Sequence, residues 1–297
     1  MSRLRDNVNL GPSYLREEIK KGYVIAPGVF SGISAIIAER IGFKAGYISG
    51  SGIAGMMGLP DLSLTTLTEV AEEVRKIVSI TKIPVIVDVD TGFGETLNVV
   101  RTVRVLESAG ASGIHIEDQE LPKKCGHLPG KKVIPAEDMQ KKIMAAVEAR
   151  KNDDFLIIAR TDSRAVEGFE SAVQRGKMYL EAGADMIFPE ALENENEFRE
   201  YAKHVKPLLA NMTEFGKSPL LSAKELGEMG YNIIIFPLTA FRAHLLAIEE
   251  IYTQLYKEET QRNFINKLMT RKRFYDYIGY DDYEREDQEL FMKKLIK

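Results

Sequence analysis

The only cysteine of this chain lies in a short basic stretch, Lys123-Lys124-Cys125-Gly126-His127. Positively charged neighbours favour the thiolate and lower the pKa of a thiol, so we expect one that exchanges a proton near neutral pH. Prolines and glycines punctuate this part of the chain, which predicts a loop able to close over a substrate. A solvated run of charge is the alternative interpretation. The candidates here are Lys123, Cys125 and His127 for catalysis and Gly126 for substrate binding.

Three carboxylates form a second group of interest. Asp88 and Asp90 end one apolar run, and Glu117 ends the next. Residues i and i+2 of a strand point to the same face, so the two aspartates can face one point. Like charges held together raise each other's pKa unless a cation lies between them. A set of oxygen ligands suits Mg²⁺, with Mn²⁺ as a substitute, better than Zn²⁺. In the alternative interpretation, one aspartate caps the following helix.

Side chains able to hold anions form a third group. Arginine grips a carboxylate with two parallel hydrogen bonds, and backbone amides near glycines bind anions as well. Two arginines, a lysine loop and a divalent cation imply a substrate with two or three carboxylates, or a phosphonate. Arg160 has the alternative of pairing only with Asp162. The candidates are Arg160, Arg242, Asn211, Thr213 and the stretch Ser49-Gly50-Ser51, with His115 and Glu190 on or beside neighbouring apolar runs.

The elements that must position these residues are eight short apolar runs, each typical of a strand buried on both faces of a parallel sheet. Amphipathic segments between the runs predict helices. Eight such units predict a single α/β domain, a (β/α)8 barrel of TIM type, whose chemistry lies at the carboxyl ends of the strands. A doubly wound open sheet is the alternative. The predicted strands are 23–26, 46–49, 84–89, 113–117, 155–159, 185–188, 207–210 and 232–236, and the helices are 31–40, 66–78, 96–108, 136–150, 168–181, 195–205 and 222–229.

Local signals support these boundaries. Ser31, Thr66 and Ser222 are expected helix N-caps, and a glutamate three residues after Thr66 and Ser222 predicts capping boxes there. Glycine follows four predicted helices, where a left-handed cap is expected. These glycines are Gly42, Gly110, Gly183 and Gly230. The glycine-dense stretch 50–55 opens no obvious helix.

Two segments lie outside the predicted barrel. Residues 1–22 are expected to form an N-terminal helical segment, and about 243–297 a C-terminal helical oligomerisation segment that begins with a helix over 243–257. Aromatic side chains in this polar tail favour docking on a neighbouring subunit. Packing on the chain's own barrel is the alternative.

Composition excludes several classes of protein. The 297 residues carry 40 Lys and Arg against 44 Asp and Glu, a net charge of −4, so no basic face for nucleic acid is expected. A single cysteine excludes an intrachain disulfide framework and favours a reducing compartment. No apolar run is long enough to span a membrane, and residues 1–21 lack the apolar core of a signal peptide. We expect a cytoplasmic protein.

Five motifs together resemble the isocitrate lyase and phosphoenolpyruvate mutase superfamily, from about residue 26 to the tail. The lysine–cysteine–histidine loop is specific for its carbon–carbon lyase branch, and the segments 188–191 and 211–216 are similar to those of lyases acting on 2-methylisocitrate. The motifs are Val87-Asp88-Val89-Asp90-Thr91-Gly92-Phe93-Gly94, His115-Ile116-Glu117-Asp118-Gln119, Lys123-Lys124-Cys125-Gly126-His127, Ala159-Arg160-Thr161-Asp162 and Asn211-Met212-Thr213-Glu214-Phe215-Gly216.

The resemblance implies a barrel whose eighth helix is swapped between subunits, in a homotetramer built as a pair of dimers. It also implies Mg²⁺ held by Asp88, Asp90 and Glu117, partly through water. The implied activity is cleavage of 2-methylisocitrate, a small tricarboxylate, to pyruvate and succinate, a step of propionate catabolism. Asp61 and His115 complete the set of expected pocket residues.

The implied chemistry assigns a role to each side chain. Tyr47 is the candidate base for the hydroxyl proton, and Cys125 donates a proton to carbon. Arg160 and His127 stabilise the carbanion. Glu190, Asn211, Thr213 and Arg242 hold the succinate carboxylates.

Other activities stay open on the same residues. Isocitrate lyase-like cleavage and oxaloacetate hydrolysis are the alternatives, and Ser51 stands where relatives often have glycine or alanine, which blurs the substrate preference. A catalytically silent dicarboxylate-binding scaffold is the alternative outside the enzymes. An inactive relative is expected to have lost the cysteine or a carboxylate of the acidic group, and this chain has kept them all.

Overall fold

Eight parallel strands form the centre of the computed structural model, which describes residues 8–293. Strands β2 to β6 pair in order, and β7 pairs with β8, which pairs with β1. Single bridges between Gly28 and Tyr47 and between Ile187 and Leu208 join the two sheets, so the strands close into the predicted (β/α)8 barrel. The strands are β1 Val24–Pro27, β2 Gly46–Ile48, β3 Val85–Asp88, β4 Gly113–Glu117, β5 Leu156–Thr161, β6 Met186–Pro189, β7 Leu209–Asn211 and β8 Ile233–Phe236.

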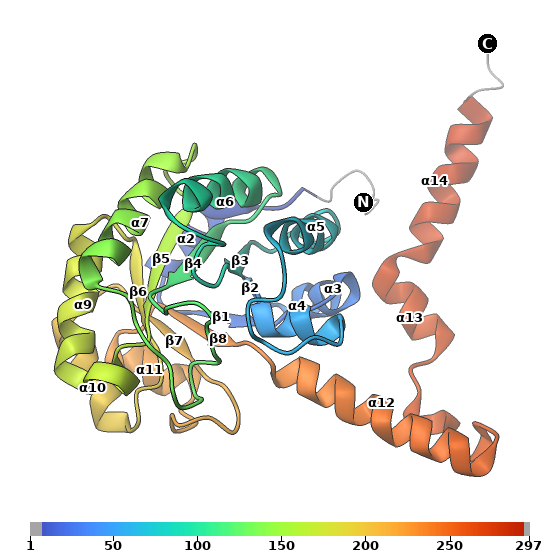
Figure 1. Ribbon diagram of the computed structural model, residues 1–297. Helices are drawn as coiled ribbons and strands as arrows, with labels where there is room; N and C mark the ends of the chain where they lie inside the picture. Colours follow the sequence, from blue (N-terminus) through green and yellow to red (C-terminus); the bar gives the residue numbers. More distant parts are fainter. Residues whose placement is uncertain (1–7, 294–297) are drawn as a thin grey trace.

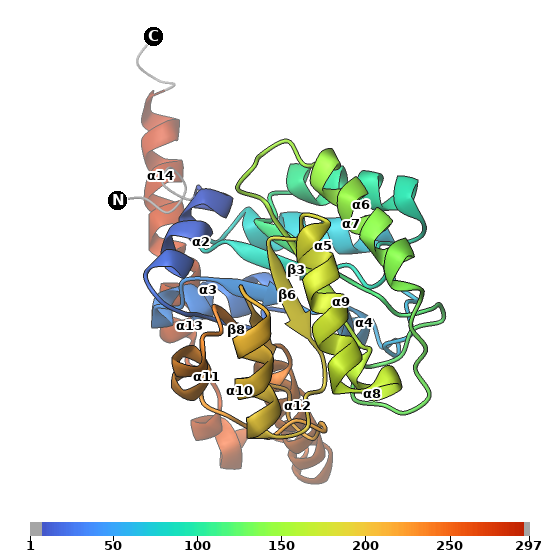
Figure 2. The same ribbon diagram turned by 90° about the vertical axis from the view of Figure 1, so that its left-hand side faces the viewer.

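Helices surround the strands on the outside of the barrel (Figures 1 and 2). Seven of them match the predicted helices to within a few residues: α3 Gly32–Ile41, α5 Leu67–Val78, α6 Thr96–Ser108, α7 Ala136–Ala149, α9 Phe169–Glu181, α10 Glu195–His204 and α11 Ala223–Met229. Two short helices, α4 Gly50–Met56 and α8 Arg164–Glu167, were not predicted. The expectation that the glycine-dense stretch opens no helix was therefore wrong.

The predicted caps are confirmed. Ser31, Thr66 and Ser222 each accept a hydrogen bond from the backbone three residues later and complete a capping box. The glycines after the helices lie in the left-handed region, which residues with a side chain rarely adopt. Their φ angles are 112° at Gly42, 92° at Gly110, 101° at Gly183 and 102° at Gly230.

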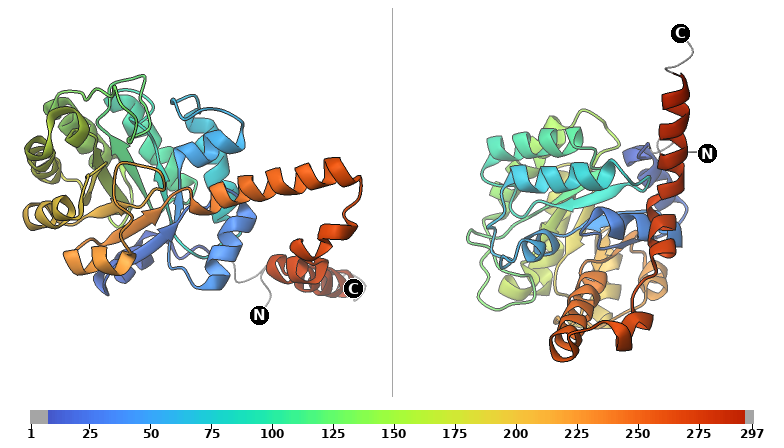
Figure 3. Two further views of the ribbon diagram at one scale, coloured as in Figure 1. Left: turned by 90° about the horizontal axis from the view of Figure 1, so that it is seen from below. Right: turned by 90° about the vertical axis from the view of Figure 1, so that its right-hand side faces the viewer.

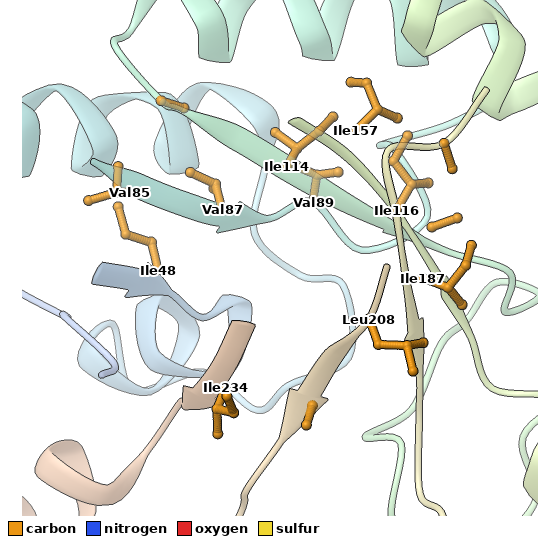
Figure 4. Packing of buried hydrophobic residues seen from close by; sticks show 14 of the residues in the cluster. Ile48, Val85, Val87, Val89, Ile114, Ile116, Ile157, Ile187, Leu208 and Ile234 are labelled. Carbon is orange, nitrogen blue, oxygen red and sulfur yellow. The ribbon is translucent and has the colours of Figure 1, made fainter. Parts of the chain in front are cut away.

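Alternate residues of each strand face the helices and the barrel interior. Figure 4 shows the layer against the helices, where Val85, Val87 and Ile114 are buried with their neighbours. The interior layer contains Ile86 on β3 and Ile158 on β5. Because side chains alternate along a strand, the next interior positions toward the carboxyl ends are Asp88 and Arg160. The strand register thus points polar side chains into the mouth.

Helix α2, Gly11–Lys20, lies at the opposite end of the barrel and falls within the predicted N-terminal segment, of which residues 1–7 lie outside the described part. Its Leu15 is fully buried in the interior layer. Arg16 pairs with Asp185 at 2.8 Å, just before β6 begins. The amino ends of the strands are therefore covered by the chain's own helix.

The C-terminal segment leaves the barrel (Figures 1 and 3). It consists of α12 Thr239–Glu258, a 3-10 helix Arg262–Lys267, α13 Arg271–Ile278 and α14 Tyr280–Lys293. Only Phe241 of α12 is buried, and Leu246, Tyr252 and Tyr256 are exposed. Helix α13 returns to α3, where Arg40 contacts Asp276 at 3.2 Å. The exchange of the eighth helix between subunits stays a prediction. Among the described residues, no helix combines the length and apolar character that crossing a membrane requires.

Candidate active site

The carboxyl ends of the strands surround a cavity of about 60 Å³. Most of the predicted site residues meet there. Those lining the cavity are Tyr47, Ser49, Asp61, Asp88, Lys123, Cys125, Gly126, His127, Arg160, Glu190, Asn211 and Thr213. Gly50, Asp90, Glu117 and His115 touch these residues from behind, whereas Ser51 and Arg242 lie elsewhere.

Asp88 and Asp90 are held in place by backbone and side-chain donors. The amide of Asp90 donates to Asp88 Oδ1 at 3.0 Å, and the amide of Gly50 donates to Asp88 Oδ2 at 3.1 Å. Asp90 has a φ of 48°, unusual for a residue with a side chain, and Ser63 donates to its Oδ2 at 2.9 Å. These contacts orient two carboxylates next to each other at the end of β3.

Lys123 connects this acidic group to the cysteine loop. Its Nζ lies 2.8 Å from Asp90 Oδ1 and 2.5 Å from Asp61 Oδ1. Although burial opposes a charged lysine, the surrounding carboxylates, Glu117 and Asp88 foremost, raise the pKa of Lys123 above its ordinary value. Its ammonium is therefore a permanent positive charge that balances Asp61 and Asp90.

The acidic group has the chemistry of a hard-cation site. Glu117 is fully buried, and neither of its carboxylate oxygens accepts a hydrogen bond within residues 8–293. Burial raises the pKa of Glu117 well above its ordinary value, a cost that a bound cation removes. Asp90 Oδ1 instead faces the Lys123 ammonium at 2.8 Å. Within residues 8–293, no three acidic, histidine or cysteine side chains are already gathered as metal ligands. The two oxygens of Glu117 fit a divalent cation, and ligation requires the three carboxylates to draw together.

Tyr47 and His115 form a buried pair beneath the cavity. The Tyr47 hydroxyl and His115 Nε2 are 2.7 Å apart, and His115 Nε2 is 3.6 Å from Asp88 Oδ1. Burial raises the pKa of Tyr47 well above its ordinary value and lowers that of His115 to about 4. At neutral pH the phenol keeps its proton and the imidazole is uncharged, and the tautomer of the ring decides which of the two donates. The predicted base role of Tyr47 therefore requires the phenol first to lose its proton.

The cysteine loop lies against the cavity and is tied down at several points. Gln119 forms two hydrogen bonds of 2.9 Å with the backbone of Lys124. Gly126 packs against Arg160 and Glu190 so closely that a Cβ atom would lie 2.6 Å from Arg160 Nη2 and from Glu190 Oε1. Only glycine fits at this position, which explains its place between Cys125 and His127.

The expected lowering of the Cys125 pKa is wrong. Burial raises the pKa of this thiol above its ordinary value, and Glu190 and Asp61 raise it further. Lys123, the lysine expected to lower it, turns its ammonium to Asp61 and Asp90. Cys125 is consequently a protonated thiol at neutral pH, suited to donating a proton.

His127 and Glu190 are in direct contact in the wall of the cavity. His127 Nε2 is 2.8 Å from Glu190 Oε1, while the amide of Lys217 donates to His127 Nδ1 at 3.0 Å. The proton of the neutral ring is therefore on Nε2. Asn211 donates to Glu190 Oε2 at 3.2 Å. Burial opposes ionisation of Glu190, but Arg160 and His127 outweigh it and lower its pKa below the ordinary value. An ionised Glu190 repels carboxylates, so it orients His127, Arg160 and Asn211 instead of holding succinate as expected.

Arg160 is surrounded by buried carboxylates. Its guanidinium donates to Asp162 at 2.9 and 3.2 Å, and its Nη1 is 3.2 Å from Glu117 Oε2. Its Nε is also 4.0 Å from Glu190 Oε2. The alternative that Arg160 pairs only with Asp162 is thus wrong, because the same side chain contacts three strand ends.

Two predicted substrate contacts lie away from the cavity. Arg242 Nη1 is 2.7 Å from both the carbonyl oxygen and Oε2 of Glu214, and the guanidinium lies over the exposed ring of Phe215. Ser51 lies in the first turn of α4. Neither side chain lines the cavity in this arrangement.

Sequence reasoning missed an apolar wall and a buried lysine. Phe188, Pro237 and Leu238 line the cavity beside the polar groups, and each is at the end of a predicted strand, a signal that was available. Lys131 was overlooked because a lysine beside Lys132 is typical of a solvated charge run, yet its side chain is only 1% exposed.

Comparison with known proteins gives a consistent result. A model of the phosphoenolpyruvate phosphomutase family matches residues 15–256. The chain is 56% identical to 2-methylisocitrate lyase of Aeropyrum pernix, over 94% of this chain and 91% of that protein. It is 43% identical to 2-methylisocitrate lyase of Escherichia coli, over 91% of this chain and 92% of that protein.

Solved structures of the same fold cover nearly the whole chain. A 2,3-dimethylmalate lyase superposes with a TM-score of 0.89 at 35% identity, covering 95% of this chain and 96% of that one. An oxaloacetate acetylhydrolase bound to 3,3-difluorooxalacetate has the same TM-score at 32% identity, with 95% and 97% covered. A phosphonopyruvate hydrolase in complex with oxalate and Mg²⁺ has a TM-score of 0.86 at 29% identity, with 98% and 100% covered.

Proposed function

The chain belongs to the phosphoenolpyruvate phosphomutase family, within the isocitrate lyase superfamily, and we propose that it is a lyase that cleaves 2-methylisocitrate to pyruvate and succinate. The observation that carries the proposal is the position of the Cys125 thiol at a cavity that buried carboxylates also line. A carbon–carbon lyase of this kind needs both an acid for the carbanion and a site that stabilises an alkoxide. The two named relatives, whose matches cover 94% and 91% of this chain, carry this activity in their names.

The carboxylates have two different roles: one set would bind a cation, and the other orients side chains of the site. Asp88, Asp90 and Glu117 would hold Mg²⁺, as the two buried oxygens of Glu117 that accept no hydrogen bond within residues 8–293 suggest. When bound, such a cation supplies Lewis acidity, which lowers the pKa of a substrate hydroxyl and stabilises the charge that develops on its oxygen. Asp162 and Glu190 instead fix Arg160 and His127.

The chain's own residues then handle the protons and the developing charge. The hydroxyl proton leaves the substrate toward the Tyr47–His115 pair, and cleavage of the carbon–carbon bond releases pyruvate. The electron pair stays on the succinate carbon as the aci-carboxylate, whose charge faces Arg160 and the Nε2 proton of His127. Cys125 then gives its thiol proton to that carbon. One proton leaves oxygen and one reaches carbon, so the reaction is balanced.

The cavity is narrow in this arrangement, with a volume of about 60 Å³, and Lys123, Cys125, Gly126 and His127 form part of its wall. We infer that the cysteine loop moves aside for a tricarboxylate to enter. Once closed again, the loop excludes water, which protects the carbanion from stray protonation.

A comparison of substrates tests the proposal. Pyruvate release from 2-methylisocitrate is measured with a coupled assay, alongside isocitrate and oxaloacetate, with and without EDTA. We expect 2-methylisocitrate to have the highest kcat/KM, and EDTA to abolish turnover until Mg²⁺ or Mn²⁺ is restored. A higher kcat/KM for glyoxylate release from isocitrate would overturn the substrate assignment, and undiminished turnover in EDTA would overturn the metal assignment.

Oxaloacetate hydrolysis is the second candidate function. It is favoured by the likeness to oxaloacetate acetylhydrolase, whose chain superposes over nearly the full length. The two activities differ in the assay just described, because hydrolysis of oxaloacetate yields oxalate and acetate and no pyruvate.

Replacing Gly126 by Ala is expected to lower kcat by about 10²-fold, the usual cost of displacing catalytic groups by about 1 Å. The added Cβ meets Arg160 and Glu190, which keeps the loop from closing fully. Steady-state kinetics measure the effect. Gly52→Ala is the matched control, because a Cβ there meets no heavy atom nearer than 3.6 Å, and its kcat should stay within about twofold of wild type. A Gly126→Ala enzyme with wild-type kcat would contradict the close packing of the loop.

We further propose a cytoplasmic homotetramer, a pair of dimers in which α12 of one copy packs on the barrel of another. Its exposed Leu246, Tyr252 and Tyr256 supply an apolar face for that contact. The tail from about residue 243 is then the oligomerisation segment of a single barrel domain.

A further inference from the structure

Lys131 has an environment unlike that of the other lysines near the cysteine loop. Its Nζ lies 2.7 Å from Asp162 Oδ1 and donates a second hydrogen bond to the carbonyl oxygen of Gly126. The side chain is 1% exposed, whereas that of the adjacent Lys132 is 78% exposed and only 3.8 Å from Glu120. Removing an ammonium from water is costly, so these two partners are what keep Lys131 buried.

One end of this connection is rigid. Asp162 follows directly on β5, and its amide donates to Asp118 Oδ1 at 2.8 Å. Asp118 is itself fixed, because Thr161 and Tyr179 donate to its Oδ2 at 2.8 Å each. The carboxylate of Asp162 is therefore held to the barrel, and it orients Arg160 as well as Lys131.

The other end is the part of the loop that must move. Gly126 stands between Cys125 and His127, so a bond to its carbonyl oxygen positions both neighbours at once. The loop is held at its start by Gln119, which bonds to the backbone of Lys124. At Gly126 itself, Lys131 supplies the hydrogen bond that joins the loop to the barrel.

We propose that Lys131 is a positioning residue that holds the cysteine loop closed. In the open loop the ammonium keeps Asp162 and loses Gly126, and in the closed loop it has both. The same carboxylate therefore sets the direction of Arg160 and the closure of the loop that carries Cys125. This role deepens the proposed lyase function and rests on it for its catalytic consequence, but loop closure itself is measurable without any substrate.

The test uses the single cysteine as a reporter of loop opening. Alkylation of Cys125 by iodoacetamide and hydrogen–deuterium exchange of peptide 121–130 are measured in full-length protein. The variants are Lys131→Met, which keeps the length of the side chain without its charge, and Lys131→Arg, which keeps the charge. Lys132→Met is the matched control, since it removes the same charge from the neighbouring position.

We expect Lys131→Met to alkylate and exchange about ten- to a hundredfold faster, as for loss of one charge-assisted hydrogen bond. Removing a nearby cation by itself raises a thiol pKa and slows alkylation, so faster alkylation reports an opened loop. Its kcat should fall by a similar factor, with a smaller change in KM. Lys131→Arg should recover most of the protection, and Lys132→Met should match wild type.

The possible results separate the role of Lys131 in loop closure from the proposed lyase activity. Unchanged alkylation, exchange and kcat in a folded Lys131→Met protein would overturn the role of Lys131, whatever the substrate. Faster alkylation of Lys131→Met, together with a wild-type protein that does not cleave 2-methylisocitrate, would support the role of Lys131 in loop closure and overturn the proposed function. If Lys131→Met fails to fold, Lys131→Gln, with a shorter neutral donor, is measured instead, and loop protection equal to wild type overturns the proposal.

Discussion

Cys125→Ser is expected to lower the rate of 2-methylisocitrate cleavage by about 10²- to 10⁴-fold, the range that a positioned general acid contributes. Serine keeps the shape of cysteine, but its hydroxyl is a much weaker acid than a thiol, so the carbanion is left without its proton donor. The variant should still fold and bind Mg²⁺ and pyruvate, because neither depends on the sulfur. Steady-state kinetics and calorimetric titration measure both properties. Retained turnover in this variant would remove Cys125 from the mechanism.

The pH dependence of the wild-type enzyme is a control for this assignment. An acid must hold its proton to act, and burial raises the pKa of the Cys125 thiol above its ordinary value. The rate should therefore persist through neutral pH and fall only in the alkaline range, as the thiol loses its proton. A rate that rises along the titration of this thiol would indicate a nucleophile instead of an acid.

Arg160→Met is expected to abolish measurable turnover and to reduce the free energy of unfolding by about 3–5 kcal/mol, the cost of removing one partner from a buried ion pair. Glu117, Asp162 and Glu190 all contact this guanidinium, and all three are buried. Without it, three carboxylates share the mouth with one fewer cation. Activity and chemical denaturation are the two measurements.

Arg164→Met is the matched control for that prediction. Arg164 also contacts two carboxylates, Glu193 and Glu197, but this cluster is partly open to solvent, so its ion pairs should contribute less than those of Arg160. Its variant should keep wild-type activity. Equal losses of stability in the two variants would show that burial of the Arg160 cluster has no special weight.

The barrel and most of its mouth could be predicted because their signals are local. Strand 113–117 was predicted with its observed bounds, and the glycine after four of the helices marked where the next strand begins. Since side chains alternate along a strand, Asp88, Glu117 and Arg160 had to share the interior once the barrel was assumed. Gly126 and Cys125 were predicted as site residues because the stretch that contains them has an unusual composition, with the only cysteine beside two lysines and a histidine.

The features that were missed depend on contacts between distant segments. Helix α4 is rich in glycine, a poor helix former, but a Cβ at Gly55 would lie 2.7 Å from the ring of Phe241, so close packing demands the glycine. Arg242 turns to Glu214, a partner that the pattern of anion-binding residues did not reveal. The pKa of Cys125 is raised first by burial and then by neighbouring carboxylates, and both depend on how distant segments pack.

Helix α2, with Leu15 buried inside the barrel, closes the end of the barrel opposite the cavity. The two ends can therefore change independently, because the end closed by α2 contributes stability while ligands enter and leave at the other end. Substitutions near α2 should alter the melting temperature and leave selectivity untouched, whereas new substrates can be acquired by exchanging a few strand-end residues. A fluorophore or surface tether attached beside α2 would likewise report on the enzyme without disturbing its turnover.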